Sequence, residues 1–356
     1  MARAPNIYYL VLDGRASSRV LEQYFEHSDA QFIDALRGRG FYIAERSHAN
    51  YAHTFLSLAS ALNMEYLDWV RETLGAGSTD PSLPYRMIDN NEVARFLKAR
   101  GYLFVNISSG WGPTNALSYA DRNTNVGNPL AEFYDVFLHS TILRPVVSAG
   151  AREYARGRIL RSLAGLRVVD ARVQPMFVFA HVLAPHPPFV FGRNGELRRP
   201  RSLGLRASWG DRQAYVDQLI FTDRSVLEFV DRILADSDTG PIIVIQSDHG
   251  PASSGSLDRP TLRILRERMP IFNAYLVPDA LRRALHDTIS PVNTFRVILG
   301  QSFGAHLPLL KDEAYFSGSA APLPVARRDP GAHGWRGRAQ GEPEGRAGHG
   351  APPPGP

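Results

Sequence analysis

An apolar run that stops abruptly on polar residues is the feature that most constrains the fold of this chain. Residues 241–245 read Pro-Ile-Ile-Val-Ile and lead directly into Gln-Ser-Asp-His-Gly at 246–250. Such β-branched stretches predict a strand buried on both faces, as in a mostly parallel sheet covered by helices. Ligands collect at the carboxyl ends of strands in such sheets, so Asp248 and His249 are candidate metal ligands. A helix-capping Asp248 and a surface His249 would give the same pattern.

A second strand of the same design stands near the start of the chain. Residues 7–12 are apolar and are followed by Asp13-Gly14. Residues 29–39 then have helical spacing, and residues 41–44 are typical of another strand. This succession predicts a βαβ unit and an α/β fold, with a central, mostly parallel sheet and helices on both faces. Asp13 is therefore expected at the same sheet edge as Asp248.

Composition limits the chemistry that this chain can carry out. The 356 residues are 44% hydrophobic and 21% charged, which is typical of a globular domain. The chain has no cysteine, so thiolate metal sites and a cysteine nucleophile are excluded, and any metal must be held by oxygen and imidazole. The net charge of +5 comes mostly from scattered arginines, which argues against nucleic acid as a partner. We find neither a long apolar run nor a leader pattern, and therefore expect no transmembrane segment and no secretion signal in this chain.

Thr54 stands where a polar loop gives way to a predicted helix. Residues 47–53 are loop-like, and residues 54–64 have helical character. Free N–H groups and the helix dipole at such a position favour a bound phosphate. A threonine there is also a common N-cap. Its hydroxyl becomes a useful nucleophile only with a base or a metal to ionise it, which the two strand ends would supply.

Two histidines follow another predicted strand at residues 176–183. His181 lies near the end of this strand, and His186 lies in the proline-rich loop after it. Either one alone could be structural, His181 in the core and His186 at the surface. Trp111 follows a further predicted strand at 102–105, and we expect it either to line the pocket or to lie in the core.

Together these segments resemble the alkaline phosphatase superfamily, in particular its sulfatase-like branch, which includes lipoteichoic acid synthases and phosphoethanolamine transferases. The resemblance rests on Asp13-Gly14, the loop before Thr54 and the sequence Ser-Asp-His-Gly at 247–250, and extends from about residue 6 to residue 316. It implies an alkaline-phosphatase-like fold in which Asp13, Thr54, Asp248 and His249 surround one divalent cation, whether zinc, manganese, magnesium or calcium. Thr54 would be the nucleophile, forming a phosphothreonine.

The histidine pair also has a counterpart in the transferases of this branch. By that likeness His186 would contact the phosphate or protonate the leaving oxygen, and His181 would support it. The further histidine that transferases often have after Asp-His-Gly does not occur here before His286. The leaving-group arrangement or the number of metal ions in those relatives therefore need not apply.

The resemblance also implies what the substrate is. We expect a phosphodiester or phospholipid headgroup, lipid-linked or glycan-linked, because the Cys/Ser-X-Pro-X-Arg motif of common sulfatases does not surround Thr54. A sulfate or phosphonate ester hydrolase is the alternative, and a non-catalytic binding module is a third. Relatives are membrane-anchored and extracytoplasmic, but the sequence leaves the compartment of this chain open.

The remaining segments complete the predicted domain organisation. Helices are predicted at 91–100, 212–236 and 290–300, and a strand at 269–277. Residues 1–320 would form the catalytic domain. Residues 321–356 are rich in proline, glycine and arginine and are expected to be a disordered tail.

Overall fold

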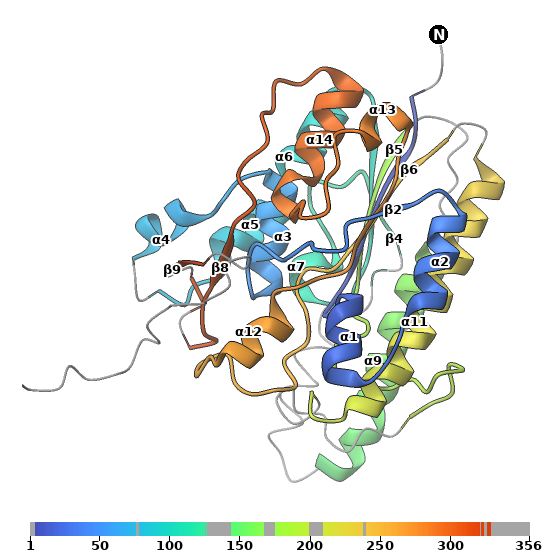
Figure 1. Ribbon diagram of the computed structural model, residues 1–356, viewed down its shortest axis with the longest axis vertical. Coiled ribbons are helices and arrows are strands. Elements are labelled where there is room, and N and C mark those ends of the chain that lie inside the picture. The colour runs from blue at the N-terminus through green and yellow to red at the C-terminus, as the bar shows by residue number, and fades with distance from the viewer. Residues whose placement is uncertain are drawn as a thin grey trace, which may run out of the picture.

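A central sheet of seven strands forms the core of the protein (Figure 1). The computed structural model describes residues 4–75, 78–124, 126, 144–166, 175–198, 209–237, 240–320, 322–323 and 326–328. The strand order is β2-β7-β6-β1-β5-β3-β4. Their bounds are β1 Ile7–Leu12, β2 Tyr42–Ile43, β3 Leu103–Ile107, β4 Arg122–Thr124, β5 Met176–Val182, β6 Ile242–Gln246 and β7 Asn273–Leu276.

Strand β1 occupies the middle of the sheet and pairs in parallel with β5 and β6. The pairing of β5 with β3 and of β3 with β4 is also parallel, whereas β7 runs antiparallel to both β6 and β2. The predicted α/β fold class, with a central and mostly parallel sheet, is therefore confirmed. Because the four long strands β1, β3, β5 and β6 share one direction, their carboxyl ends meet at one edge.

Helices cover both faces of this sheet (Figure 1). One face packs against α2 (Ala30–Gly38), α9 (Arg144–Gly165) and α11 (Arg212–Asp236). The opposite face packs against α3 (Thr54–Asn63), α6 (Glu92–Lys98) and α14 (Pro291–Phe303). The shorter helices are α1 Ser18–Phe25, α4 Asp68–Leu74, α5 Ser82–Asp89, α7 Gly112–Asn115, α12 Leu262–Arg268 and α13 Asp279–Arg282.

The alternation of side chains along β1 explains why the strand is apolar throughout. Ile7, Tyr9 and Val11 point into one helical layer, and the residues between them point into the other. Every residue of β1 is buried. A strand covered on both faces cannot alternate apolar and polar residues, so its polar chemistry is confined to its end.

The predicted elements are found with small shifts in their bounds. The helix predicted at 212–236 is α11, and the strand at 269–277 is the shorter β7. The predicted βαβ unit exists as β1, α2 and β2, but β6 and β7 stand between its two strands in the sheet. The long α9 was not among the predicted helices.

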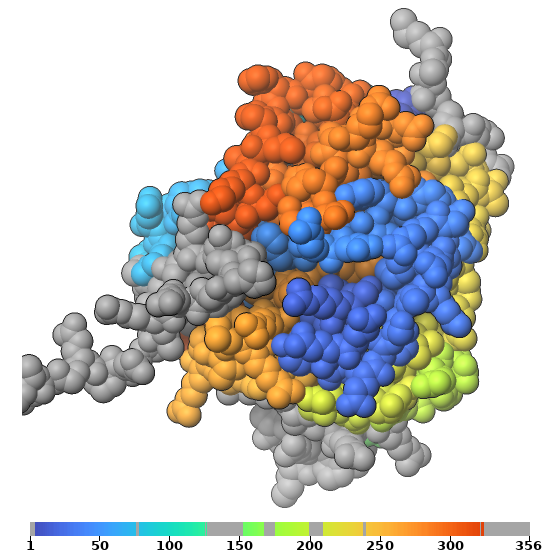
Figure 2. Space-filling view, in the orientation of Figure 1, coloured from blue at the N-terminus to red at the C-terminus, as the bar shows by residue number. Residues whose placement is uncertain are grey.

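Segments far apart in the sequence form one face of the molecule. In Figure 2, α1 (dark blue) and α12 (orange) lie beside each other.

Strands β8 (Ala314–Phe316) and β9 (Ala326–Arg328) form a separate two-stranded sheet. Apart from β9 and residues 322–323, the predicted tail lies outside the described residues. Within the described part of the chain, no helix combines the length and hydrophobicity needed to cross a bilayer.

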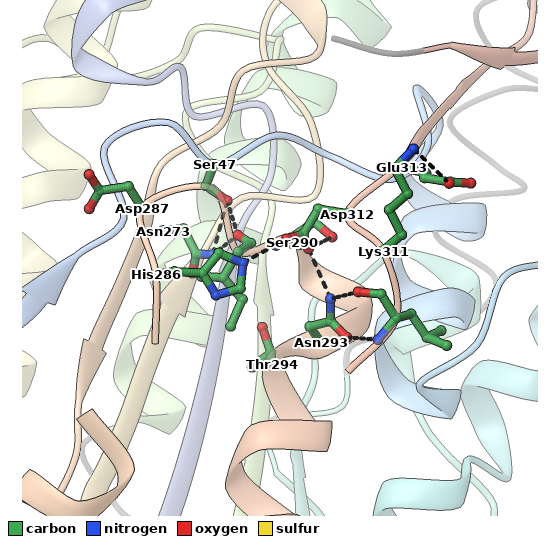
Figure 3. A network of polar contacts seen from close by, with 12 residues as sticks. Ser47, Asn273, His286, Asp287, Ser290, Asn293, Thr294, Lys311, Asp312 and Glu313 are labelled. Atoms are coloured by element: carbon green, nitrogen blue, oxygen red, sulfur yellow. Dashed lines mark hydrogen bonds and ion pairs between the residues drawn. The ribbon is translucent and has the colours of Figure 1, made fainter. Parts of the chain in front are cut away.

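A partly buried carboxylate fixes the start of α14 (Figure 3). Asp312 Oδ1 accepts hydrogen bonds from the backbone N and the Oγ of Ser290 and from Nδ2 of Asn293, at 2.9, 2.7 and 2.9 Å. Asp312 Oδ2 lies 2.7 Å from His286 Nε2. These partners lower the pKa of Asp312 although burial raises it. The carboxylate thus caps a helix from a distant part of the chain.

We predict that Asp312→Asn lowers the free energy of unfolding at pH 7 by about 1–3 kcal/mol, because buried donors lose a charged acceptor. A lowered pKa contributes stability above the unfolded value, near 4, and this contribution is lost as the pH falls through the folded value. Urea unfolding at a series of pH values should therefore show the two proteins converging in acid. Asp34→Asn, in an exposed pair with Arg37, is the control and should change stability little. A gap that persists at low pH would contradict the prediction.

Candidate metal centre

Three buried side chains from two strand ends converge at the carboxyl edge of the sheet. Asp13 follows β1, and Asp248 and His249 follow β6; the candidate ligand atoms of the three residues all lie within 4.8 Å of one another. His249 Nε2 lies 3.2 Å from Asp248 Oδ2 and 3.6 Å from Asp13 Oδ1. The pairing of β1 with β6 brings the two segments together.

The hydrogen bonds of His249 determine which of its nitrogens faces the carboxylates. Its Nδ1 lies 3.0 Å from the carbonyl oxygen of Gly250, which can only accept, so Nδ1 carries the proton. Burial and the nearby Arg268 guanidinium lower the pKa of His249 well below its ordinary value, which keeps the ring neutral. Nε2 therefore presents a lone pair to Asp13 and Asp248, the state in which histidine binds metals.

The two carboxylates also present acceptor atoms without donors. Asp13 Oδ1 and Asp248 Oδ2 are buried, and neither accepts a hydrogen bond from the described residues. Burial and the charge of Asp13 raise the pKa of Asp248 to about 7. For Asp13, burial raises the pKa, but the neighbouring His186 and His181 outweigh burial and hold the pKa below its usual range. Two unpaired carboxylate oxygens beside the lone pair of His249 Nε2, all buried, fit a divalent cation bound by oxygen and nitrogen.

Thr54 is the first residue of α3 and reaches this cluster. Its Oγ1 lies 3.0 Å from His249 Nε2, and because Nε2 is unprotonated, the hydroxyl donates. The residue is partly exposed, unlike the three buried candidate ligands. The hydroxyl is thus at the boundary between the buried acceptors and solvent, and the free N–H groups of the helix start are beside it.

Buried polar side chains fix the loop that carries Thr54. Asn50 accepts a hydrogen bond from the backbone N of Val292 at 2.8 Å and donates to the carbonyl of Glu313 at 2.8 Å. Arg268 donates from Nε and Nη2 to the carbonyl of Ala52, at 2.9 and 2.8 Å. The same guanidinium donates from Nη1 to the carbonyl of Gly250 at 2.8 Å. Arg268 therefore ties the threonine loop to the Asp-His-Gly segment.

Both predicted histidines lie beside the cluster. His181, fully buried on β5, has Nε2 3.5 Å from Asp13 Oδ2 and Nδ1 3.0 Å from Thr114 Oγ1. The His186 ring lies 6.2 Å from the His249 ring between centroids, and burial lowers the pKa of His186. The structure thus brings all six predicted site residues together, although the roles assigned to them remain predictions.

Two glycines of the predicted motifs are required by close packing. Gly14 has φ +73°, and a Cβ there would lie 2.9 Å from the Trp209 ring. A Cβ on Gly250 would lie 2.3 Å from the carbonyl oxygen of Glu267. The buried Glu267 in turn accepts hydrogen bonds from the backbone N atoms of Ser253 and Ser254.

Sequence reasoning missed several of the supporting residues. No sequence pattern singled out Arg268, Trp209, Asn50 or Thr114. The Trp209 ring lies 5.1 Å from that of His186. The sequence around these residues has no pattern that identifies them as supports, because their partners are distant in the sequence.

Comparison with solved structures shows the fold. The C-terminal periplasmic domain of EcEptC from Escherichia coli matches with a TM-score of 0.57 and 12% identity, over 90% of this chain and 91% of that domain. A zinc complex of that domain matches with a TM-score of 0.55 and 13% identity, over 85% and 83%. The sulfatase candidate yidJ from Bacteroides fragilis matches with a TM-score of 0.53 and 13% identity, over 90% and 83%. The chain therefore shares the fold of these periplasmic domains and of the sulfatase candidate.

A membrane protein shares the same fold. The integral membrane protein lipooligosaccharide phosphoethanolamine transferase A from Neisseria meningitidis matches with a TM-score of 0.50 and 13% identity, over 85% of this chain. This chain spans 55% of the length of that protein. No protein-family model and no curated protein matches the sequence.

We predict that the protein binds about one zinc or manganese ion per chain and that His249→Ala abolishes this binding, since it removes the imidazole ligand. Elemental analysis after dialysis against the metal salt measures the stoichiometry. His306→Ala removes an exposed histidine and should leave the metal content unchanged. Full metal occupancy in a folded His249→Ala variant would contradict the assigned site.

We predict that Gly250→Ala lowers the free energy of unfolding by about 1–3 kcal/mol, because its Cβ would overlap the backbone carbonyl of Glu267. Thermal and urea unfolding measure the change. Gly112→Ala is the matched control, since a Cβ at Gly112 would have no neighbour within 4 Å. Equal stability of the two variants would show that the segment after β6 is not packed as described.

Proposed function

We propose that this chain is an enzyme that transfers or hydrolyses phosphate esters, with Thr54 as the nucleophile and one divalent cation at the Asp13, Asp248 and His249 cluster. The position of Thr54 Oγ1 carries the proposal: it lies 3.0 Å from the unprotonated nitrogen of His249, above two unpaired carboxylate oxygens. The fold shared with EcEptC and its zinc complex supports it. A hydroxyl placed only to cap a helix would not need three buried acceptors beneath it.

The chemical step follows from this placement. Thr54 Oγ1 attacks phosphorus, the bond from phosphorus to the leaving oxygen breaks, and a phosphothreonine forms. A bound cation would use the lone pair of His249 Nε2, so the hydroxyl proton passes to solvent, which reaches the partly exposed Thr54. The cation, when bound, supplies positive charge that favours the ionised hydroxyl and neutralises the phosphate. Water or an acceptor alcohol then takes the phosphoryl group from Thr54.

We assign His186 the role of protonating the leaving oxygen, and His181 a supporting role beside it. The Nδ1 of His186 lies 2.7 Å from the carbonyl of Pro187 and donates to it, which leaves Nε2 for the substrate. Burial lowers the pKa of His186, but an anionic phosphate beside the ring favours its protonated form, which donates to the departing oxygen. His181, held by Thr114 and facing Asp13, orients that carboxylate.

A phosphodiester is the substrate class that we favour. Within the described part of the chain, only Asp13, Asp248 and His249 are grouped closely enough to hold a metal ion, and a single cation suits the one negative charge of a diester. The structure of lipooligosaccharide phosphoethanolamine transferase A from Neisseria meningitidis has the same fold, which supports a lipid-linked or glycan-linked ester. Sulfate ester hydrolysis is the second candidate, because the sulfatase candidate yidJ also shares the fold.

We predict that Thr54→Ala lowers turnover of an aryl phosphodiester at least about a thousandfold while metal content and stability are retained, because the nucleophile alone is lost. Thr54→Ser keeps the hydroxyl and should retain measurable activity. Mass spectrometry of the wild-type protein quenched during turnover should find the phosphoryl group on Thr54.

Controls separate this proposal from its alternatives. Turnover by a clean Thr54→Ala variant would remove Thr54 from the mechanism. Parallel assays with an aryl sulfate and an aryl phosphomonoester identify the ester class, and faster sulfate hydrolysis would overturn the preference for phosphodiesters.

A further inference from the structure

Three partly exposed aromatic side chains form a continuous arc beside Thr54. Phe55 of α3, Tyr85 of α5 and Trp111 before α7 are each only partly buried. The centroids of the Phe55 and Tyr85 rings are 5.9 Å apart, and those of Tyr85 and Trp111 are 6.0 Å apart. Both pairs pack edge to face, with interplanar angles of 89° and 81°. We call these three residues the aromatic arc.

Both ends of the aromatic arc adjoin the candidate metal centre. At one end, Phe55 follows Thr54 directly in the first turn of α3. At the other end, the Trp111 ring lies 5.5 Å from the His181 ring between centroids, at an angle of 75°. His181 in turn faces Asp13. The arc therefore borders the centre from the nucleophile to the buried histidine.

The rings are anchored on the side that faces the core. Phe55 and Trp111 both pack against the hydrophobic cluster between the sheet and α3. Edge-to-face contacts hold neighbouring rings in fixed relative orientations, so little conformational entropy is lost when a ligand covers their exposed parts. Aromatic surface that is rigid and accessible beside reacting groups is typical of ligand sites.

The charged groups of the centre leave the rest of the ester to be recognised in another way. Arg268, whose charge acts on His249, uses its guanidinium for the carbonyls of Ala52 and Gly250. The acceptor cluster and the start of α3 can bind only the phosphate itself. Affinity for a particular ester must then come from surface next to Thr54, and the aromatic arc is that surface.

We propose that the aromatic arc binds an apolar group esterified to the substrate phosphate, so that the preferred substrates are hydrophobic phosphodiesters. This inference rests on the proposed function, since it assumes that the phosphate is bound at Thr54. The exposed parts of Phe55, Tyr85 and Trp111 contact the organic group, and the contact excludes water from them. A phosphodiester with only small hydrophilic groups lacks this contact.

Binding of two unreactive diesters tests the proposal. Diphenyl phosphate and dimethyl phosphate each carry one negative charge and differ in their apolar groups. In calorimetry with the zinc-loaded protein, we expect diphenyl phosphate to bind at least about tenfold more tightly. Tyr85→Ala should reduce this preference roughly three- to tenfold, because one ring of the arc is lost. Tyr85→Phe keeps the ring and should keep the preference.

A matched control and a second variant make the result decisive. Trp69→Ala removes an aromatic side chain of α4 that is 38% exposed and lies outside the arc, and it should leave the preference unchanged. If Tyr85→Ala fails to fold, Tyr85→Leu keeps most of the volume without the aromatic face. Equal binding of the two diesters by the wild-type protein, or an unchanged preference in the folded variant, would overturn the proposal.

Turnover measured separately distinguishes failure of this inference from failure of the proposed function. Hydrolysis of methyl p-nitrophenyl phosphate without any preference for diphenyl phosphate in binding would overturn the role of the arc alone. A preference that depends on Tyr85, in a protein that hydrolyses none of the esters, would support the arc and overturn the proposed catalysis.

Discussion

The repulsion among three buried acceptors is the interaction on which the rest of this structure depends. Asp13 and Asp248 bring two carboxylates from different strands to one place, and His249 adds a lone pair between them. Burying two carboxylates and a histidine lone pair together costs free energy unless protons or a cation neutralise their charge. The rise of the Asp248 pKa to about 7 expresses that cost in the absence of a cation. A divalent ion bound there would remove the cost and would place positive charge next to Thr54.

The fold holds the three acceptors close together despite their mutual repulsion. Parallel pairing of β1 with β6 fixes the two strand ends, and the close approach at Gly250 fixes the turn after β6. Arg268 then joins the loop before Thr54 to that turn through backbone carbonyls. Because the buried Arg268 side chain binds main-chain carbonyls on both segments, the backbone that carries the hydroxyl is held in place. This rigidity is what a pre-organised nucleophile requires.

The sequence predicted the sheet and the principal residues because both follow local rules. Buried strands read as apolar runs, and polar residues at their ends stand out, which identified Asp13, Asp248 and His249. The antiparallel β7 and the separation of β1 from β2 were not predicted, since strand order depends on long-range packing. Arg268 and Asn50 were missed as supports for the same reason: their partners are distant in sequence. The aromatic arc likewise combines residues from three segments, and the sequence of one segment does not indicate that the other two lie beside it.

The most direct test of the metal centre is a crystal structure of zinc-loaded protein with anomalous diffraction at the zinc edge. The account predicts one strong anomalous peak at about 2.0–2.3 Å from Asp13, Asp248 and His249 Nε2, with Thr54 Oγ1 beside it. A fully loaded crystal with its peak elsewhere, for example between His286 and Asp312, would contradict the assignment of this cluster as the metal centre.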